Sequence, residues 1–270
     1  ATAVTDTEWF DAQLAADRML PRPGQPAPTT GPIATSGFGN YHALVIGNDN
    51  YRHLAQLRTA RADARAVGAL LAERYGFTVE TLLDANREQI LIALTGLRKR
   101  LRPDDNLLIY YAGHGWLDEA ADEGYWLPVD ATAENDVRWI SNATITSHFR
   151  AIEAKHVLVV ADSCFSGTLT RGIRISSNTP SDLERMASRK ARIVLSSGGE
   201  EPVSDGTGAH SAFATEFLGA LRDNNAVLDT TSLYAQIRRP VMLASDQDPD
   251  LADIRKAGHD GGDFLFVPRD

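Results

Sequence analysis

The chain has 270 residues, of which 43% are hydrophobic and 23% are charged, and its formal net charge at pH 7 is -9. This length and apolar content are enough to bury a sizeable core in one large domain or two unequal ones, and they exclude general disorder. The acidic balance argues against nucleic-acid binding, which rests on clustered Lys and Arg, and it favours basic substrates or partners.

No run approaches the roughly 18 apolar residues that a membrane-spanning helix needs, so no membrane span is expected within these residues. The chain begins at Ala1, and a signal or anchor removed upstream stays open. Cys164 is the single cysteine, which excludes an internal disulfide and fits a reducing compartment, although a cysteine-poor envelope protein has the same composition. The sequence therefore leaves the localisation undetermined between cytoplasm and cell envelope.

The first forty residues differ in composition from the rest. Residues 1–20 contain one stretch with a helical pattern, and the segment 21–40 carries five prolines within a run of twelve residues. Proline fixes φ and cannot continue a helix, so this segment is expected to be a linker of polyproline character. We therefore predict one folded domain over residues 41–270.

Six short, β-rich apolar segments follow in this domain. They are residues 42–48, 77–83, 106–113, 156–162, 192–198 and 263–267. Four of them are nearly continuous apolar runs, which is typical of strands covered on both faces.

Segments of helical period lie between these strands, at 61–76, 86–101, 211–221 and 231–239. Gly76 is expected to end the first helix, Asn86 to cap the second, and Pro240 to end the fourth. Because strands and helices alternate, we predict an α/β fold with a mostly parallel six-stranded sheet flanked by helices on both faces.

Two of the predicted strands end in residues that carry chemistry. The stretch "YYAGHG" places His114 after the third strand, and "DSCFSG" places Cys164 after the fourth. Open parallel sheets carry their chemistry beyond the carboxyl ends of the strands, so both residues are expected on one rim. A thiol attacks an acyl carbon as thiolate, and a neutral imidazole can take its proton and later protonate the leaving amine. Cys164 and His114 suit these two roles.

Glycines beside both residues indicate backbone that no side chain covers. We predict that the N–H groups of Gly115 and Cys164 bind the oxyanion. A lone strand-end cysteine is more often a small core residue, and a lone histidine more often a hydrogen-bonded structural one. The two together, each in a glycine turn on one rim, favour catalysis.

The stretches "LLIYYAGHG" and "VLVVADSCFSG" resemble the paired motifs of the caspase-like cysteine peptidases, closest to their bacterial, metacaspase-like branch. His114 and Cys164 are fifty positions apart, which matches the spacing typical of caspases. The similarity runs from about Tyr41 to Val267. It implies a caspase-type sheet, hydrolysis of peptide bonds through an acyl-enzyme, a Cys–His dyad without an obligatory acidic third member, and a bacterial origin.

The resemblance also implies cleavage after Arg or Lys. Asp162 stands two positions before the cysteine, as in metacaspase-like members, and Asp63 matches the other acidic pocket position of the family. Two carboxylates in a narrow pocket select a basic side chain, preferably Arg, which pairs bidentately. Asp205 is a third candidate for the pocket or its rim. The alternative roles are a helix N-terminal acid for Asp63 and a turn residue for Asp205.

The segment 168–192 between two predicted strands is long for a compact domain unless it is functional or partly helical. An enzyme that cuts after basic residues has candidate self-cleavage sites here at Arg171, Arg174, Arg185 and Lys190, as relatives do in this region. A surface loop that happens to be basic is the alternative.

No cofactor is required by this chemistry, and calcium dependence, which some metacaspases show, is not indicated. The acidic run 118–124 is expected to be a solvated loop rather than a site for a cation or a basic substrate. The expected partners are protein or peptide substrates with basic residues, and the oligomeric state is undetermined.

Alternative functions stay open from the sequence. One is a non-catalytic caspase-fold interaction module, or a zymogen that needs an activator. Another is a hydrolase or acyltransferase that uses the thiol on a non-peptide ester or amide. A nucleotide-binding domain is disfavoured, because the first strand is followed by "IGNDNY" without the glycine spacing of a phosphate loop.

Overall fold

The computed structural model describes residues 38–163, 180–198, 208–254 and 256–269. The predicted N-terminal segment and the predicted linker up to residue 37 lie outside this part of the chain, as do Cys164 and Asp205. The described residues belong to one compact unit, Ser36–Asp270. Within it, none of the described helices is long and apolar enough to cross a membrane.

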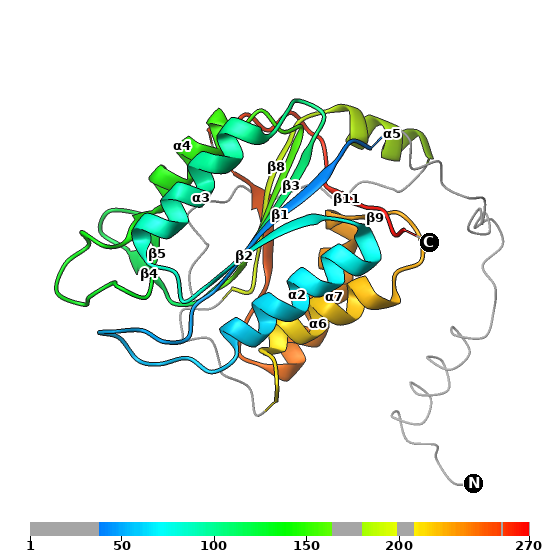
Figure 1. Ribbon diagram of the computed structural model, residues 1–270. Coiled ribbons are helices and arrows are strands. Elements are labelled where there is room, and N and C mark those ends of the chain that lie inside the picture. The colour runs from blue at the N-terminus through cyan, green and yellow to red at the C-terminus, as the bar shows by residue number, and fades with distance from the viewer. Residues whose placement is uncertain (1–37, 164–179, 199–207, 255, 270) are drawn as a thin grey trace, which may run out of the picture. The chain divides into compact units, whose positions relative to one another are not determined.

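The centre of the unit is a six-stranded sheet with the strand order β10-β8-β7-β3-β1-β2 (Figure 1). Its strands are β1 (Tyr41–Gly47), β2 (Thr78–Leu83), β3 (Asn106–Ala112), β7 (His156–Asp162), β8 (Ala191–Ser196) and β10 (Asp250–Asp253). All neighbours pair in parallel except β10, which runs antiparallel to β8. The predicted α/β class and mostly parallel six-stranded sheet are confirmed.

Helices cover both faces of this sheet (Figure 1). On one face lie α2 (Ala60–Tyr75), α6 (Ala212–Asp223) and α7 (Thr230–Ala244), and on the other lie α3 (Arg87–Arg100) and α4 (Asn142–Ala151). Every residue of β3, β7 and β8 is buried, as expected for apolar strands packed between two layers.

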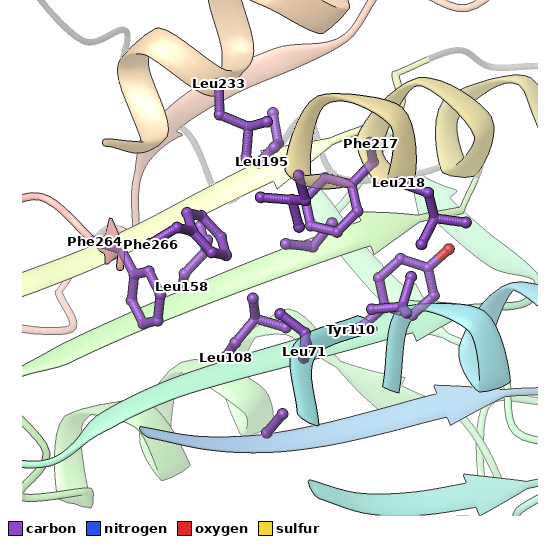
Figure 2. Packing of buried hydrophobic residues seen from close by; sticks show 14 of the residues in the cluster. Leu71, Leu108, Tyr110, Leu158, Leu195, Phe217, Leu218, Leu233, Phe264 and Phe266 are labelled. Carbon is purple, nitrogen blue, oxygen red and sulfur yellow. The ribbon is translucent and has the colours of Figure 1, made fainter. Parts of the chain in front are cut away.

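The core on the α2 side joins helix and sheet side chains (Figure 2). Leu71 from α2 and Phe217 from α6 pack over Leu108, Leu158 and other sheet residues. Burial of each such side chain contributes about 1.5–3 kcal/mol to the stability of the fold. This packing holds the helices in place against the strands.

The predicted helix boundaries at Gly76 and Asn86 are confirmed. Gly76 follows α2 with a φ of 65°, a left-handed conformation that glycine adopts without a Cβ penalty. Asn86 caps α3 by accepting a hydrogen bond from the backbone N–H of Gln89, whose side chain accepts one from the N–H of Asn86 in return.

The position of the sixth strand was predicted wrongly. It is β10, whereas the predicted run 263–267 contains β11 (Leu265–Phe266), which pairs with β9 (Leu228–Asp229) in a separate two-stranded sheet. The Tyr41 hydroxyl donates to the carbonyl oxygen of Leu265 (2.9 Å), and the ring of Phe264 lies 6.0 Å from that of Tyr41. These contacts hold the run over the α2-side core instead of at the sheet edge.

The predicted end of the fourth helix at Pro240 is also wrong, because α7 continues to Ala244 with Pro240 inside it. Ile237 and Val241, on either side of the proline, are both buried, and their packing outweighs the one backbone hydrogen bond that proline cannot make. The helices α4 and α5 (Pro180–Ser188) and the three-stranded sheet of β4 (Gly115–Asp118), β5 (Glu123–Trp126) and β6 (Ile140–Ser141) were not predicted.

Candidate functional site

The rim that carries the two predicted dyad residues is formed by the ends of β3 and β7. Ala112 pairs with Asp162 in the parallel register, and the N–H of Gly113 donates to the carbonyl oxygen of Asp162 (3.4 Å). His114 is the second residue beyond this pair on one strand, and Cys164 is the second residue beyond it on the other. His114 is described and half-buried, whereas Cys164 lies outside the described residues.

The imidazole of His114 is oriented by a backbone carbonyl. Its Nε2 lies 2.9 Å from the carbonyl oxygen of Ala55. Because a carbonyl oxygen only accepts, Nε2 carries a proton, and in the neutral form of the ring Nδ1 has the free lone pair. The ring also packs against Tyr51, with 4.5 Å between the ring centroids. The ring of His114 is thus oriented by a backbone carbonyl, and no carboxylate of the described residues is bonded to it.

Two buried tyrosines hold the backbone of His114. The hydroxyl of Tyr51 accepts a hydrogen bond from the N–H of His114 (2.7 Å), and the hydroxyl of Tyr111 donates to its carbonyl oxygen (2.8 Å). Burial raises the pKa of both phenols above the ordinary value, so both stay protonated. A Cβ on Gly113 would stand 2.6 Å from the Tyr51 hydroxyl and 3.0 Å from that of Tyr111. The absence of a side chain at this position therefore leaves room for both hydroxyl groups.

Sequence reasoning missed both tyrosines and the Ala55 carbonyl. Gly115, the predicted oxyanion donor, is the first residue of β4 and lies opposite Trp126. The second predicted donor is the N–H of Cys164, which lies outside the described residues, so the oxyanion pair stays a prediction.

The two predicted pocket carboxylates lie together beside this rim. Asp63 is on the first turn of α2, Asp162 ends β7, and both side chains are fully buried. They line one narrow cavity together with Leu57, Thr59, Ala60, Ala112 and Gly113. Gly113 therefore borders both the cavity and the backbone of His114.

Asp162 is the carboxylate with a free acceptor. Its Oδ2 accepts hydrogen bonds from the hydroxyls of Ser211 (2.5 Å) and Tyr110 (3.3 Å), whereas its Oδ1 is buried without a partner among the described residues. Burial above all, together with the charge of Asp63, raises the pKa of Asp162 from 3.8 to about 7, while hydrogen bonds from neighbouring hydroxyls act against this shift.

Asp63 has partners on both of its oxygens. Oδ1 lies 2.5 Å from Nδ1 of His210, and Oδ2 accepts a hydrogen bond from the N–H of Ser211 (3.3 Å). Burial raises the pKa of Asp63, while the bonds from His210 and Ser211 act against this shift. Sequence reasoning missed His210 and Ser211, although Ser211 stands at the start of a predicted helix, which it caps in the structure.

The remaining predicted residues are spread over other parts of the chain. Asp205, Arg171 and Arg174 lie outside the described residues. Arg185 is exposed on α5, and Lys190 is exposed directly before β8, where its carbonyl oxygen accepts hydrogen bonds from the N–H groups of residues 260 and 262. Cleavage requires an extended segment with free backbone groups, whereas Arg185 lies in a helix and the carbonyl of Lys190 is hydrogen-bonded in the fold.

The acidic run 118–124 forms the turn between β4 and β5. Oδ1 of Asp118 accepts hydrogen bonds from the N–H groups of Ala120 and Ala121, and Oε1 of Glu123 accepts one from Ala143. These carboxylates satisfy backbone donors. In the described part of the chain, no three His, Cys, Asp or Glu side chains are grouped so that they could hold a metal ion.

His114 follows β3 in the structure, and Cys164 follows β7 in the sequence, where β3 and β7 are neighbouring parallel strands. A histidine and a cysteine are the residue types that a thiol peptidase uses. A sequence model described as the caspase domain matches residues 40–256. The chain belongs to this family of cysteine-type peptidases, and its predicted caspase-like and metacaspase-like character is confirmed.

Individual relatives are distant. Metacaspase-1A of Neurospora crassa is 30% identical over 150 residues, which cover 48% of this chain and 33% of the relative. Metacaspase-1B of Aspergillus terreus is 30% identical over 178 residues, which cover 56% of this chain and 47% of the relative. The chain thus spans less than half the length of these two relatives. Both are fungal and do not bear on the predicted bacterial origin.

Solved structures show the same fold. Caspase-1 from Spodoptera frugiperda matches with a TM-score of 0.60 at 16% identity, covering 86% of this chain and 95% of that one. A protein of Geobacter sulfurreducens matches with a TM-score of 0.57 at 19% identity, covering 83% and 99%. The predicted caspase-like sheet is confirmed.

Proposed function

We propose that this chain is a cysteine endopeptidase that hydrolyses peptide bonds after Arg or Lys through a Cys164–His114 dyad and an acyl-enzyme. The observation that carries the proposal is the register of β3 and β7, in which the second residue beyond one paired position is His114 on one strand and Cys164 on the other. Because the carboxyl ends of parallel strands lie at one edge of a sheet, this register supports a Cys164 thiol near His114.

The tautomer of His114 supports its role as the base. With the proton on Nε2 and shared with the Ala55 carbonyl, Nδ1 accepts the proton of the Cys164 thiol. The thiolate attacks the scissile carbonyl carbon, and the N–H groups of Gly115 and Cys164 stabilise the oxyanion. The imidazolium then returns its proton to the leaving amine as the C–N bond breaks, which leaves a thioester on Cys164.

Hydrolysis of the thioester reverses these roles. His114 takes a proton from water as its oxygen adds to the acyl carbon; the C–S bond then breaks, the imidazolium returns its proton to the leaving sulfur, and the new carboxylic acid is released. The Ala55 carbonyl accepts a hydrogen bond from Nε2–H in every step. This hydrogen bond stabilises the positive charge of the imidazolium that forms after each proton transfer. This chemistry requires no cofactor, and calcium dependence is not indicated.

The acidic cavity supports the choice of Arg or Lys. The unpartnered Oδ1 of Asp162 is a buried acceptor for an ammonium or guanidinium group, and Asp63 in the same cavity adds a second negative charge. A cation there lowers the electrostatic conflict of two buried carboxylates, whereas an aspartate side chain increases it. Asp205 stays a third candidate.

The test is turnover of short fluorogenic peptides that carry Arg, Lys or Asp before the reporter, by the wild type and by Cys164→Ala, with and without calcium. We expect turnover of the Arg and Lys peptides, independent of calcium and absent from Cys164→Ala. His148→Asn on α4 is a control for His114→Asn, since it makes the same change on the other face of the sheet. Wild-type protein that turns over no peptide and does not react with a thiol alkylating agent would favour an interaction module or a zymogen.

Self-processing within 168–192 is part of the proposal. Since Arg185 lies in α5 and the carbonyl of Lys190 is hydrogen-bonded in the fold, Arg171 and Arg174 are the preferred cleavage sites. The intact mass of active protein should reveal a cut that is missing from Cys164→Ala. Equal masses would contradict self-processing without affecting the proposed activity on other substrates.

A further inference from the structure

The acidic pocket contacts a titratable base of its own chain. Nδ1 of His210 lies 2.5 Å from Oδ1 of Asp63, and the side chain of His210 is 31% exposed while that of Asp63 is 1% exposed. Solvent therefore reaches part of the imidazole ring. His210 thus contacts the buried carboxylate of Asp63 on one side and solvent on the other.

His210 belongs to a connected unit around both carboxylates. The next residue, Ser211, donates its N–H to Asp63 and its hydroxyl to Asp162. The titratable groups that face this unit in the described part of the chain are Asp63 from α2, Asp162 from β7 and Tyr110 from β3. A change in the charge of His210 is therefore felt by both acids of the pocket.

A protonated His210 and a basic substrate side chain would compete for the negative charge of Asp63. With the imidazolium present, Asp63 is neutralised from within the chain, and the entering ammonium or guanidinium meets a like charge near the same carboxylate. With neutral imidazole, Nδ1–H still donates to Asp63, but the negative charge of the pocket is left for the ligand.

We propose that His210 is a specificity-determining residue of the acidic pocket, which weakens binding of a basic substrate side chain when it is protonated and permits it when neutral. The inference rests on the proposed cleavage after Arg or Lys. Basic peptides are then disfavoured in acidic solution by a group separate from the Cys164–His114 dyad.

His210→Asn is the test variant, because Asn Nδ2 can donate to Asp63 as the imidazole Nδ1 does, but it cannot be protonated. We would measure KM and kcat for an Arg peptide between pH 5.5 and pH 8, together with inhibition by the same peptide with citrulline, an uncharged isostere, in place of Arg. The variant and the wild type share the dyad and Asp162, so the pH effects that these groups have in common cancel in the ratio of their constants.

We expect KM for the Arg peptide to be about fivefold lower in His210→Asn than in the wild type at pH 5.5, as for a partly buried charge pair, and to converge at pH 8. The inhibition constant of the citrulline peptide should show no such pH-dependent ratio. His210→Lys, a permanent cation, should raise KM for the Arg peptide about tenfold at pH 8. His148→Asn should reproduce the wild-type profile.

Two results would overturn this inference and leave the proposed function intact. One is an active wild type whose KM ratio to His210→Asn is independent of pH. The other is a change in kcat that is equal at all pH values with an unchanged KM, which a structural role would produce. A wild type that cleaves no Arg or Lys peptide overturns the proposed function, and this inference with it.

Discussion

Asp162→Asn is expected to stabilise the fold while it removes activity on basic peptides. Burial raises the pKa of Asp162 from 3.8 to about 7, so the folded state binds its proton more tightly than the unfolded state does. The free energy of unfolding therefore falls as the pH rises from about 4 to about 7. The penalty for the buried charge is absent below this window and complete above it.

The size of the effect follows from the pKa difference and the local hydrogen bonds. About three pKa units correspond to about 4 kcal/mol, which is an upper bound for the penalty at pH 8. Asn keeps the shape, but its amide N–H groups stand where Oδ1 has no partner, which costs about 1–3 kcal/mol. We therefore expect a net gain of about 1–3 kcal/mol at pH 8 and no gain at pH 4.5.

The assay is urea unfolding at both pH values, with Cys164→Ala as the common background so that self-processing cannot interfere. Asp104→Asn, at a side chain that is 87% exposed, is the matched control and should shift neither curve. In the active background, kcat/KM for the Arg peptide should fall at least about 100-fold, as for loss of a buried ion-pair partner. Equal or lower stability of Asp162→Asn at pH 8 would refute the reasoning.

Three further outcomes are expected. Tyr51→Phe removes the acceptor for the N–H of His114 and keeps the ring contact, so kcat/KM should fall about tenfold with little change in KM; an unchanged kcat would show that the hydroxyl does not position the histidine. Gly113→Ala should lower kcat more than Tyr51→Phe does, because its Cβ would displace both tyrosine hydroxyls, and wild-type turnover would contradict this. Arg192→Met should lower the free energy of unfolding by about 3 kcal/mol, because the buried guanidinium donates to four backbone carbonyls; a urea midpoint equal to that of the wild type would exclude this role.

The strands that carry the site could be predicted because their apolar composition indicates that both of their faces are buried. The apolar runs that became β3 and β7 have no alternation, and this pattern is specific to strands covered on both faces. The edge strand β10 has no such signal, since "DLAD" has a charge at each end and is a strand only through its pairing with β8. The apolar run around Phe264 has the stronger local pattern, but the Tyr41 contact holds it elsewhere.

Some residues of the candidate site could likewise be expected from the sequence, and others could not. The position of His114 was expected from the end of its strand, and the placement of the two aspartates in one pocket was expected from the family resemblance; their roles stay predictions. The Ala55 carbonyl could not be expected, since every residue has a carbonyl and only the path of the loop selects this one. His210 meets Asp63 across 147 positions, a pairing that local sequence does not encode.

The antiparallel β10 also bears on how this sheet meets other molecules. β8 is buried along its whole length and would present an apolar edge with unpaired amides if β10 did not lie against it. β10 is four residues long, and Asp250 and Asp253 stand at its two ends. A short edge strand with an acid at each end is a poor template for a further strand, so this side of the sheet resists intermolecular strand addition and the aggregation that follows from it.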